Sequence, residues 1–408
     1  MMTPMGRLCF TTILIALGLY SIPLSGQENS VSSFGEWIGG GKYWIEARYR
    51  VETVDQDSFD EDAFASTLRT QLGFETADIK GLSFLAELED VSSIGNDQFN
   101  SGSNGRGEFP LVIDPDDTEL NQAYFQYLVS GNRVRLGRQA VVLDNARFFG
   151  DVDFRQNQQT YDALMWMNTA LDGHRFIYGY MDKARRFLSD ENPNGELDMQ
   201  THVINYRYRF PNQSDLVLYG HFIDMENPSL VSRSHQNVGI RYSGSWGVET
   251  KWLYAFEYAD QSPHADGADT NEADYLALEL APKFSNQWIL RLGYEQLSGD
   301  GTYAFQTPLG TNHKFNGRAD LFAGGTPPNG LRDSYVKLEV PVAGVQVNLA
   351  YHDFQSDEGN LDYGTEWDLV VSKRFRQRFG LTIAYSQYNA EVFATDTQKF
   401  WLFGSFNY

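Results

Sequence analysis

The chain has almost no cysteine: Cys9 is the only one among 408 residues, and it lies within the first ten. A disulfide framework, a thiolate metal site and a haem-attachment motif are therefore excluded for the rest of the chain. After residue 26 the sequence has no apolar run long enough for a membrane-spanning helix. Basic residues are also scarce, 32 against 54 acidic ones, which gives a net charge of −22. This balance excludes a nucleic-acid-binding protein.

Residues 1–26 have the parts of a secretory signal peptide. Arg7 supplies the positive start, Leu8–Leu24 the mostly apolar core, and Ser25 and Gly26 the small residues near a cleavage site. A membrane-anchor helix is the alternative, but the core is short and Pro23 interrupts its end. We expect cleavage near residue 26 and a short N-terminal periplasmic segment over residues 27–41.

Strict alternation of side-chain character is the strongest pattern in the remaining chain. Lys42–Glu52, His202–Phe210 and Gly247–Ala259 all alternate, with one phase mostly apolar or aromatic and the other richer in charge. A period of two belongs to strands, and a tilted strand needs about 9–11 residues to cross a bilayer. Aromatic residues make up 14% of the chain, yet its mean hydropathy is −0.42. The pattern predicts an all-β protein, a transmembrane antiparallel up-and-down β-barrel over residues 42–408.

About 18 alternating segments can be placed between Lys42 and Tyr408, and their connections alternate between short and long. Short periplasmic turns and long outer loops are typical of a barrel in the outer membrane of a Gram-negative cell. The last segment, Thr397–Tyr408, ends in the aromatic string FWLFGSFNY. It resembles the C-terminal signal bound by the barrel-assembly machinery, which we expect as a partner together with outer-membrane lipid.

Two stretches carry a more specific resemblance. The first contains LNQAY, LGRQ, D-x-x-RF-x-G and RQN-x-x-TYDA between residues 120 and 163, and the second is HKFNGRADLF…TPPNGLRDSY at residues 313–335. These strings resemble the alginate-export family of outer-membrane β-barrel porins. The resemblance implies a pore that passes an anionic polysaccharide outward. The matched positions are Arg135, Arg138, Asp144, Arg147 and Arg155.

Charged residues occupy the non-lipid phase of the strands and the segment 140–159. Asp144, Asp151 and Asp153 are expected to orient the arginines around them. Arg138 is out of phase: a bulge near Gly137 turns it inward, or it reaches water from the membrane interface. The predicted pore lining, and the predicted substrate-binding residues, are Arg48, Arg50, Arg133, Arg135, Arg138, Asp144, Arg147, Arg155, Arg207, Arg209, Lys314 and Arg318.

Two interpretations of these charges remain open. Arginine and glutamate on neighbouring strands can form ladders that brace a wide barrel. Alternatively, the arginines form a track for an anionic solute, because the guanidinium fork binds carboxylates at two points. We therefore expect a passive porin or exporter for an anionic solute such as an alginate-like polysaccharide, with a general diffusion porin as the alternative. A periplasmic export partner is an open question, and so are the solute and the oligomeric state.

Other function classes fit less well. A hydrolase on a barrel needs a histidine beside a serine or aspartate, and His202, His221, His235 and His352 stand in no triad motif. A structural or adhesive barrel with a plugged lumen is a third class. We expect no enzyme activity, no cofactor and no metal. The acidic residues of the loop near position 115 lack EF-hand spacing, although calcium binding there stays open.

Overall fold

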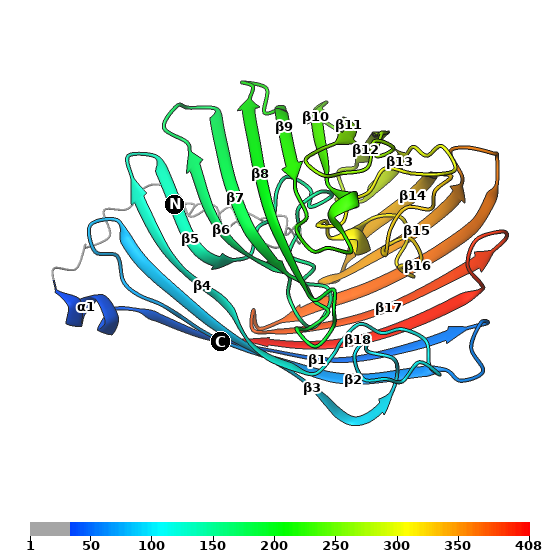
Figure 1. Cartoon of the computed structure of the whole chain (residues 1–408), viewed down its shortest axis with the longest axis horizontal. Helices are drawn as coiled ribbons and strands as arrows, with labels where there is room; N and C mark the ends of the chain where they lie inside the picture. Colours follow the sequence, from blue (N-terminus) through cyan, green and yellow to red (C-terminus); the bar gives the residue numbers. More distant parts are fainter. Residues whose placement is uncertain (1–32) are drawn as a thin grey trace, which may run out of the picture.

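The structure is a computed structural model that describes residues 33–408. A single antiparallel sheet of 18 strands forms a closed barrel, so the predicted fold class and strand number are confirmed (Figure 1). Closure comes from β1, which pairs with β2 on one side and with β18 on the other. No sheet edge is left open in residues 33–408, as a sheet surrounded by hydrocarbon requires. The strands are β1 (Lys42–Gln56), β2 (Ala63–Glu75), β3 (Leu82–Gln98), β4 (Asp117–Val129), β5 (Asn132–Gln139), β6 (Thr160–Asn168), β7 (His174–Arg185), β8 (Glu196–Arg209), β9 (Asp215–Ile223), β10 (His235–Trp246), β11 (Lys251–Pro263), β12 (Ala273–Lys283), β13 (Ile289–Leu297), β14 (Leu331–Val342), β15 (Val345–Gln355), β16 (Asp362–Phe375), β17 (Phe379–Ala390) and β18 (Thr397–Asn407).

Helical structure is confined to short pieces. The α-helix α1 (Phe34–Gly39) lies in the expected N-terminal segment, and the 3-10 turns η1 (Val231–Arg233) and η2 (Asn312–Lys314) lie in loops. Ser33 caps α1 by accepting a hydrogen bond from the backbone N–H of Glu36. Within residues 33–408, none of the helices is long and apolar enough to cross a membrane. The predicted signal peptide lies outside the described residues.

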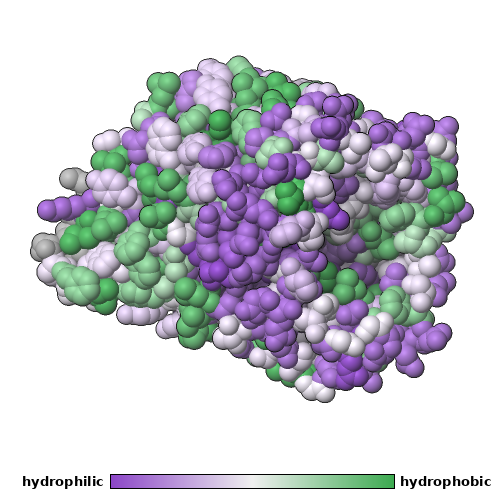
Figure 2. Space-filling model, in the orientation of Figure 1, coloured by the Kyte–Doolittle hydropathy of each residue, from purple (hydrophilic) through white to green (hydrophobic). Residues whose placement is uncertain are grey.

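The predicted phase of the strands holds in the structure. On β1, Tyr43, Ile45 and Tyr49 are exposed on the outer wall, whereas Arg50 on the other phase is buried. Figure 2 shows apolar side chains more often toward the α1 end and hydrophilic ones gathered toward the loops. An apolar surface spread around a whole barrel needs a nonpolar environment, and a charge at the bilayer midplane costs about 2–4 kcal/mol.

Short turns join the strands at the α1 end, and longer loops join them at the opposite end (Figure 1). Ser130–Gly131 and Ala343–Gly344 have positive φ at both residues, the backbone of a tight two-residue hairpin. One boundary was predicted wrongly. The segment expected from Gly247 begins at Lys251, because residues 247–250 form the turn, where Gly247 has φ +92°.

Two long loops turn back into the barrel. We name residues 140–159, between β5 and β6, inner loop A, and residues 298–330, between β13 and β14, inner loop B. Most of the largest apolar cluster of the described residues lies where these loops meet the wall. The β3–β4 loop spans residues 99–116, and its Phe99, Phe109 and Val112 form a smaller cluster with β1 and β2.

Candidate functional site

The two inner loops are joined to each other by backbone hydrogen bonds. The N–H of Gly150 donates to the carbonyl of Leu309, and the N–H of Thr311 to the carbonyl of Ala146, both at 2.9 Å. Val152 N–H donates to the Thr311 hydroxyl at 3.1 Å. Satisfied backbone groups of this kind hold loops A and B as one layer inside the barrel.

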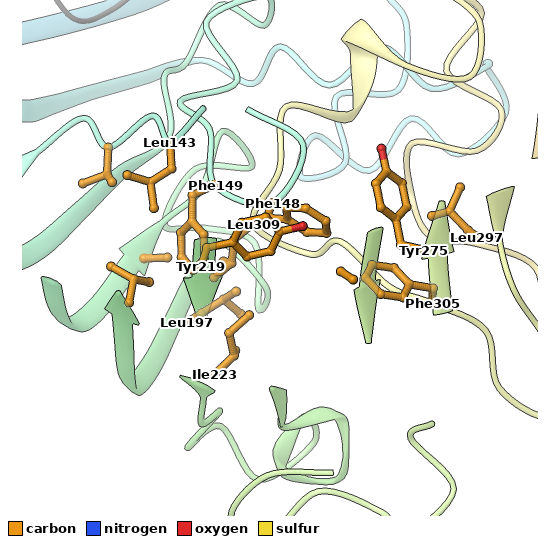
Figure 3. Packing of buried hydrophobic residues seen from close by; sticks show 14 of the residues in the cluster. Leu143, Phe148, Phe149, Leu197, Tyr219, Ile223, Tyr275, Leu297, Phe305 and Leu309 are labelled. Carbon is orange, nitrogen blue, oxygen red and sulfur yellow. The ribbon is translucent and has the colours of Figure 1, made fainter. Parts of the chain in front are cut away.

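Aromatic residues anchor this layer to the wall. Phe148 of loop A packs against Tyr219 of β9 and Tyr275 of β12, with 5.4 Å between ring centroids in each case. Phe305 of loop B packs on the same phenylalanine at 5.9 Å. Figure 3 shows Phe148 between Tyr219 on one side and Tyr275 with Phe305 on the other. Burial of such large side chains contributes about 1.5–3 kcal/mol each, so the layer is a packed core.

Arg147 also attaches loop A to the wall, through an ion pair. Its side chain is 2% exposed and forms a 2.9 Å ion pair with Glu295 of β13. It also donates to the amide oxygen of Asn316 in loop B at 2.8 Å. One guanidinium thus joins loop A, loop B and the barrel wall.

A second buried network lies on another part of the wall, around β1, six strands from β13 in the sheet order. Arg155 of loop A donates to Asp320 of loop B at 2.8 Å and to Glu52 at 3.3 Å. Arg50 pairs with Glu52 at 2.9 Å, with Asp114, and with the carbonyl of Phe154 at 2.7 Å. These guanidiniums already have carboxylates and carbonyls as partners. A solute would have to displace them at the cost of a buried unpaired charge.

The electrostatics of the loops follow from this pairing. Burial would raise the pKa of Asp153, but the guanidiniums of Arg69 and Arg48 hold that pKa below its usual range. Burial lowers the pKa of His313 to about 4 in spite of the Asp320 carboxylate 2.7 Å away. Phe154 stacks on the His313 ring with 3.3 Å between centroids. His313 is therefore a neutral packing group at pH 7.

Three lumen arginines lack such partners. Within residues 33–408, Arg133 and Arg135 of β5 and Arg207 of β8 form no ion pair within 4.0 Å. The side chain of Arg135 donates to Gln126 at 2.9 Å and lies over the ring of Tyr124. These three cations are free to meet a solute.

A pocket that is open to solvent lies beside Arg133 and Arg135, between β5–β7 and the start of loop A. Its remaining surface is mostly apolar. Strand register explains this: Arg135 pairs with Met165, and Arg133 pairs with Met167, which pairs with Ile177. Two arginines thus stand next to an apolar floor. Sequence reasoning missed this floor, although the alternation places both methionines on the lumen side.

The predicted residues therefore separate into several groups. Arg48, Arg50, Arg147, Arg155 and Arg318 are held by partners around the inner loops, and Asp144 pairs with Arg175 at 3.3 Å. Arg209 pairs with Asp215 at 2.7 Å. Lys314 is exposed on loop B. Among the predicted residues of the strands, Arg133, Arg135 and Arg207 lie on the lumen side and form no ion pair within 4.0 Å in the part of the chain that the structure describes.

Arg138 was assigned wrongly to the pore lining. It shares the phase of Leu136, which is 59% exposed on the outer wall. Its guanidinium pairs with Asp162 of β6 at 2.9 Å and donates to the carbonyl of Leu120 at 2.8 Å. Because side chains alternate strictly along a strand, Arg138 faces outward near the loop end, where this pairing compensates its charge.

Neither a metal centre nor a hydrolase triad is formed by the described residues. No group of His, Cys, Asp and Glu in residues 33–408 has the arrangement of a metal site. Asp114 pairs with Arg50, and Asp116 accepts from Ser93 N–H at 2.6 Å, so these acids have protein partners. Over the same residues no histidine hydrogen-bonds to a serine; His352, for example, bonds to Asp333 at 2.9 Å.

No family model and no curated protein matches this sequence. Solved structures do match the fold. Outer membrane protein OpdK from Pseudomonas aeruginosa has a TM-score of 0.71 at 12% identity, covering 91% of this chain and 99% of OpdK. OccAB4 from Acinetobacter baumannii has a TM-score of 0.70 at 14% identity, covering 90% and 98%. OpdK has also been solved with vanillate, with a TM-score of 0.70 at 12% identity and coverage of 91% and 99%.

These likenesses show the fold, a closed β-barrel shared with outer membrane protein OpdK and with OccAB4. Together with the apolar outer wall, this fold places the chain in an outer membrane. The resemblance to the alginate-export family finds no support in the comparisons, because neither a family model nor a curated protein matches.

Proposed function

We propose that this protein is a passive outer-membrane channel for small anionic solutes, not an enzyme. The observation that carries the proposal is the set of unpaired lumen arginines, Arg133, Arg135 and Arg207, two of which stand at the apolar pocket between β5–β7 and loop A. A guanidinium offers a carboxylate two parallel hydrogen bonds, and the methionine floor suits a solute with an apolar body.

The inner loops favour a small solute over a polymer. Loops A and B are joined by backbone hydrogen bonds and held to two separate parts of the wall, β13 by Arg147 and β1 by Arg155. An extended polysaccharide chain would need this layer to move aside. One OpdK structure was solved with vanillate, an aromatic carboxylate. In the pocket beside Arg133 and Arg135, the arginines would bind such a carboxylate and the apolar floor would contact its ring.

Reversal potential across a planar bilayer under a salt gradient tests the proposal. The variant R133Q/R135Q/R207Q removes three lumen cations. In water a charge about 6 Å away contributes about 0.7 kcal/mol, and salt screens part of it. We therefore expect the anion-to-cation permeability ratio to fall about tenfold. Vanillate on one side should reduce the current of the wild type but not of the variant.

R138Q/K183Q/R185Q is the matched control. It also removes three cations, but these form ion pairs with Asp162 and Asp198 on the outer wall. It should leave the permeability ratio unchanged. Equal shifts in both variants would show an effect of net charge only. A wild-type channel without anion preference and without vanillate block would instead support the general diffusion porin.

A further inference from the structure

The turn between β16 and β17 differs from every other short turn of the described barrel. It carries Lys373, Arg374, Arg376 and Arg378 within six residues, in a chain with a net charge of −22. Counted between strand ends, this turn contains Arg376 and Arg378 and no acid, whereas the seven other short turns together contain one lysine, Lys80, against three acids, Asp78, Asp172 and Glu249. We name residues 373–379 the basic turn.

Aromatic rings lie directly beneath these cations. The Lys373 ammonium lies 5.2 Å from the ring centre of Phe375, and the Arg378 guanidinium 4.6 Å from that of Tyr408. Phe375 pairs with Phe379 across the hairpin, and Phe379 packs on Phe406 at 5.2 Å. The negative face of each ring attracts its cation, so these contacts hold Lys373 and Arg378 beside the aromatic rings of the rim.

None of the four cations of the basic turn forms an ion pair within 4.0 Å in residues 33–408. This contrasts with Arg50, Arg147 and Arg155 around loops A and B, which have carboxylate partners. Arg376 and Gln377 form the tip, with φ of +48° and +61°, so the hairpin is tight and projects its side chains. Unpaired positive charge is thus concentrated at one point of the rim.

The position of the basic turn indicates its partner. Lys373 shares the outward phase of Leu369 and pairs with Leu381, which is 41% exposed on the outer wall. The turn therefore lies where the apolar wall ends at the periplasmic rim. Arg374 has the opposite phase and faces the lumen side. Aromatic rings at such a boundary lie at the level of lipid headgroups.

We infer that the basic turn binds the phosphate groups of anionic phospholipids in the periplasmic leaflet, through Lys373, Arg376 and Arg378. The acidic remainder of the protein repels an anionic bilayer surface, and these cations provide local attraction at the point of contact. The inference rests on the membrane position of the barrel and is independent of the solute. A soluble acidic protein is a less suitable partner, because the cations continue directly into a lipid-facing wall.

Lipid retention measured by native mass spectrometry tests this inference. The whole barrel is reconstituted in nanodiscs of phosphatidylethanolamine and phosphatidylglycerol and then released into mild detergent. Each cation near an anionic surface contributes about fivefold in affinity. We expect the wild type to retain phosphatidylglycerol preferentially, and K373Q/R376Q/R378Q to lower that preference at least about tenfold. Added salt should have the same effect.

The matched control is K80Q/K251Q/K283Q, which removes three cations elsewhere on the same rim. It should keep the lipid preference, and R376K/R378K, which keeps the charge, should keep most of it. A gel shift on heating verifies that each variant is folded. The inference is overturned if the wild type shows no preference for phosphatidylglycerol, or if the control loses as much as the basic-turn variant.

Discussion

Replacing Arg147 with methionine removes the cation that links loop A, loop B and β13. Glu295 is left buried and without its 2.9 Å ion pair, although Tyr275 at 2.7 Å and Asn316 at 2.5 Å still donate to it. Removing one partner of a buried pair costs 3–5 kcal/mol, and we take the lower end because these donors remain. About 3 kcal/mol raises the population of released loops roughly a hundredfold.

Single-channel recording in a planar bilayer measures that release. Arg147→Met should show frequent transitions to a larger conductance, while the wild type stays quiet. Adding E295Q removes the uncompensated charge and should abolish most of these transitions. R138M is the control, because it breaks an ion pair of the same 2.9 Å length on the outer wall. The reasoning is refuted if folded R147M conducts like the wild type, or if E295Q does not reduce its transitions.

Three further outcomes are expected. Unheated protein should migrate differently from boiled protein on a denaturing gel, because a closed barrel resists detergent; a single unchanged band would contradict the closed sheet. Gly317→Ala should lower the temperature at which heating changes the gel migration, since residue 317 has φ +83° and a Cβ there would meet the Glu366 carboxylate, at a cost of about 1–3 kcal/mol. Gly324→Ala, which has open space around it, should leave that temperature unchanged. An equal decrease in both variants would argue against strain at residue 317. Acidification should increase opening of the loops. The pKa of His313 is about 4 while the loops are packed and about 6.5 when they are released, so the released state binds the proton first. The packed state is therefore fully stable above pH 6.5 and loses about 1.4 kcal/mol of stability per pH unit down to about pH 4. Recordings at pH 7 and pH 5 check this, and His313→Gln should flatten the difference; the same opening rate at both pH values would rule it out.

The barrel could be predicted from sequence because its main constraint is local. Side chains alternate with a period of two, so Arg48 and Arg50 could be placed inside and Tyr49 outside without knowledge of any other strand. The same rule, applied without exception, would have placed Arg138 outside with Leu136. The prediction failed there because a bulge near Gly137 was allowed to reverse the phase. Gly137 does have φ +126°, but Arg138 keeps its outward direction.

The pairing of the lumen arginines could not be predicted, because their partners are distant in sequence. Arg147 meets Glu295 and Asn316, and Arg155 meets Glu52 and Asp320. Which carboxylate lies opposite a loop arginine depends on how two loops fold inside the barrel, and the alternation of strands contains no information on this. From the sequence alone, arginines that brace the barrel and arginines that bind an anionic solute therefore remained equal alternatives.

With the loops in place, both interpretations apply, each to different residues. Arg50, Arg147 and Arg155, on or against loops A and B, have buried carboxylate partners, and losing either member of a pair is costly, so these arginines brace the loops. Arg133, Arg135 and Arg207 project from β5 and β8 and form no ion pair with a loop carboxylate, so they remain available to an anion. The two sets of arginines are separate: the carboxylates around loops A and B pair with Arg50, Arg147 and Arg155, and they leave Arg133, Arg135 and Arg207 without an ion pair. A mutation of Arg50, Arg147 or Arg155 should therefore change the size of the passage, whereas a mutation of Arg133, Arg135 or Arg207 should change its ion selectivity.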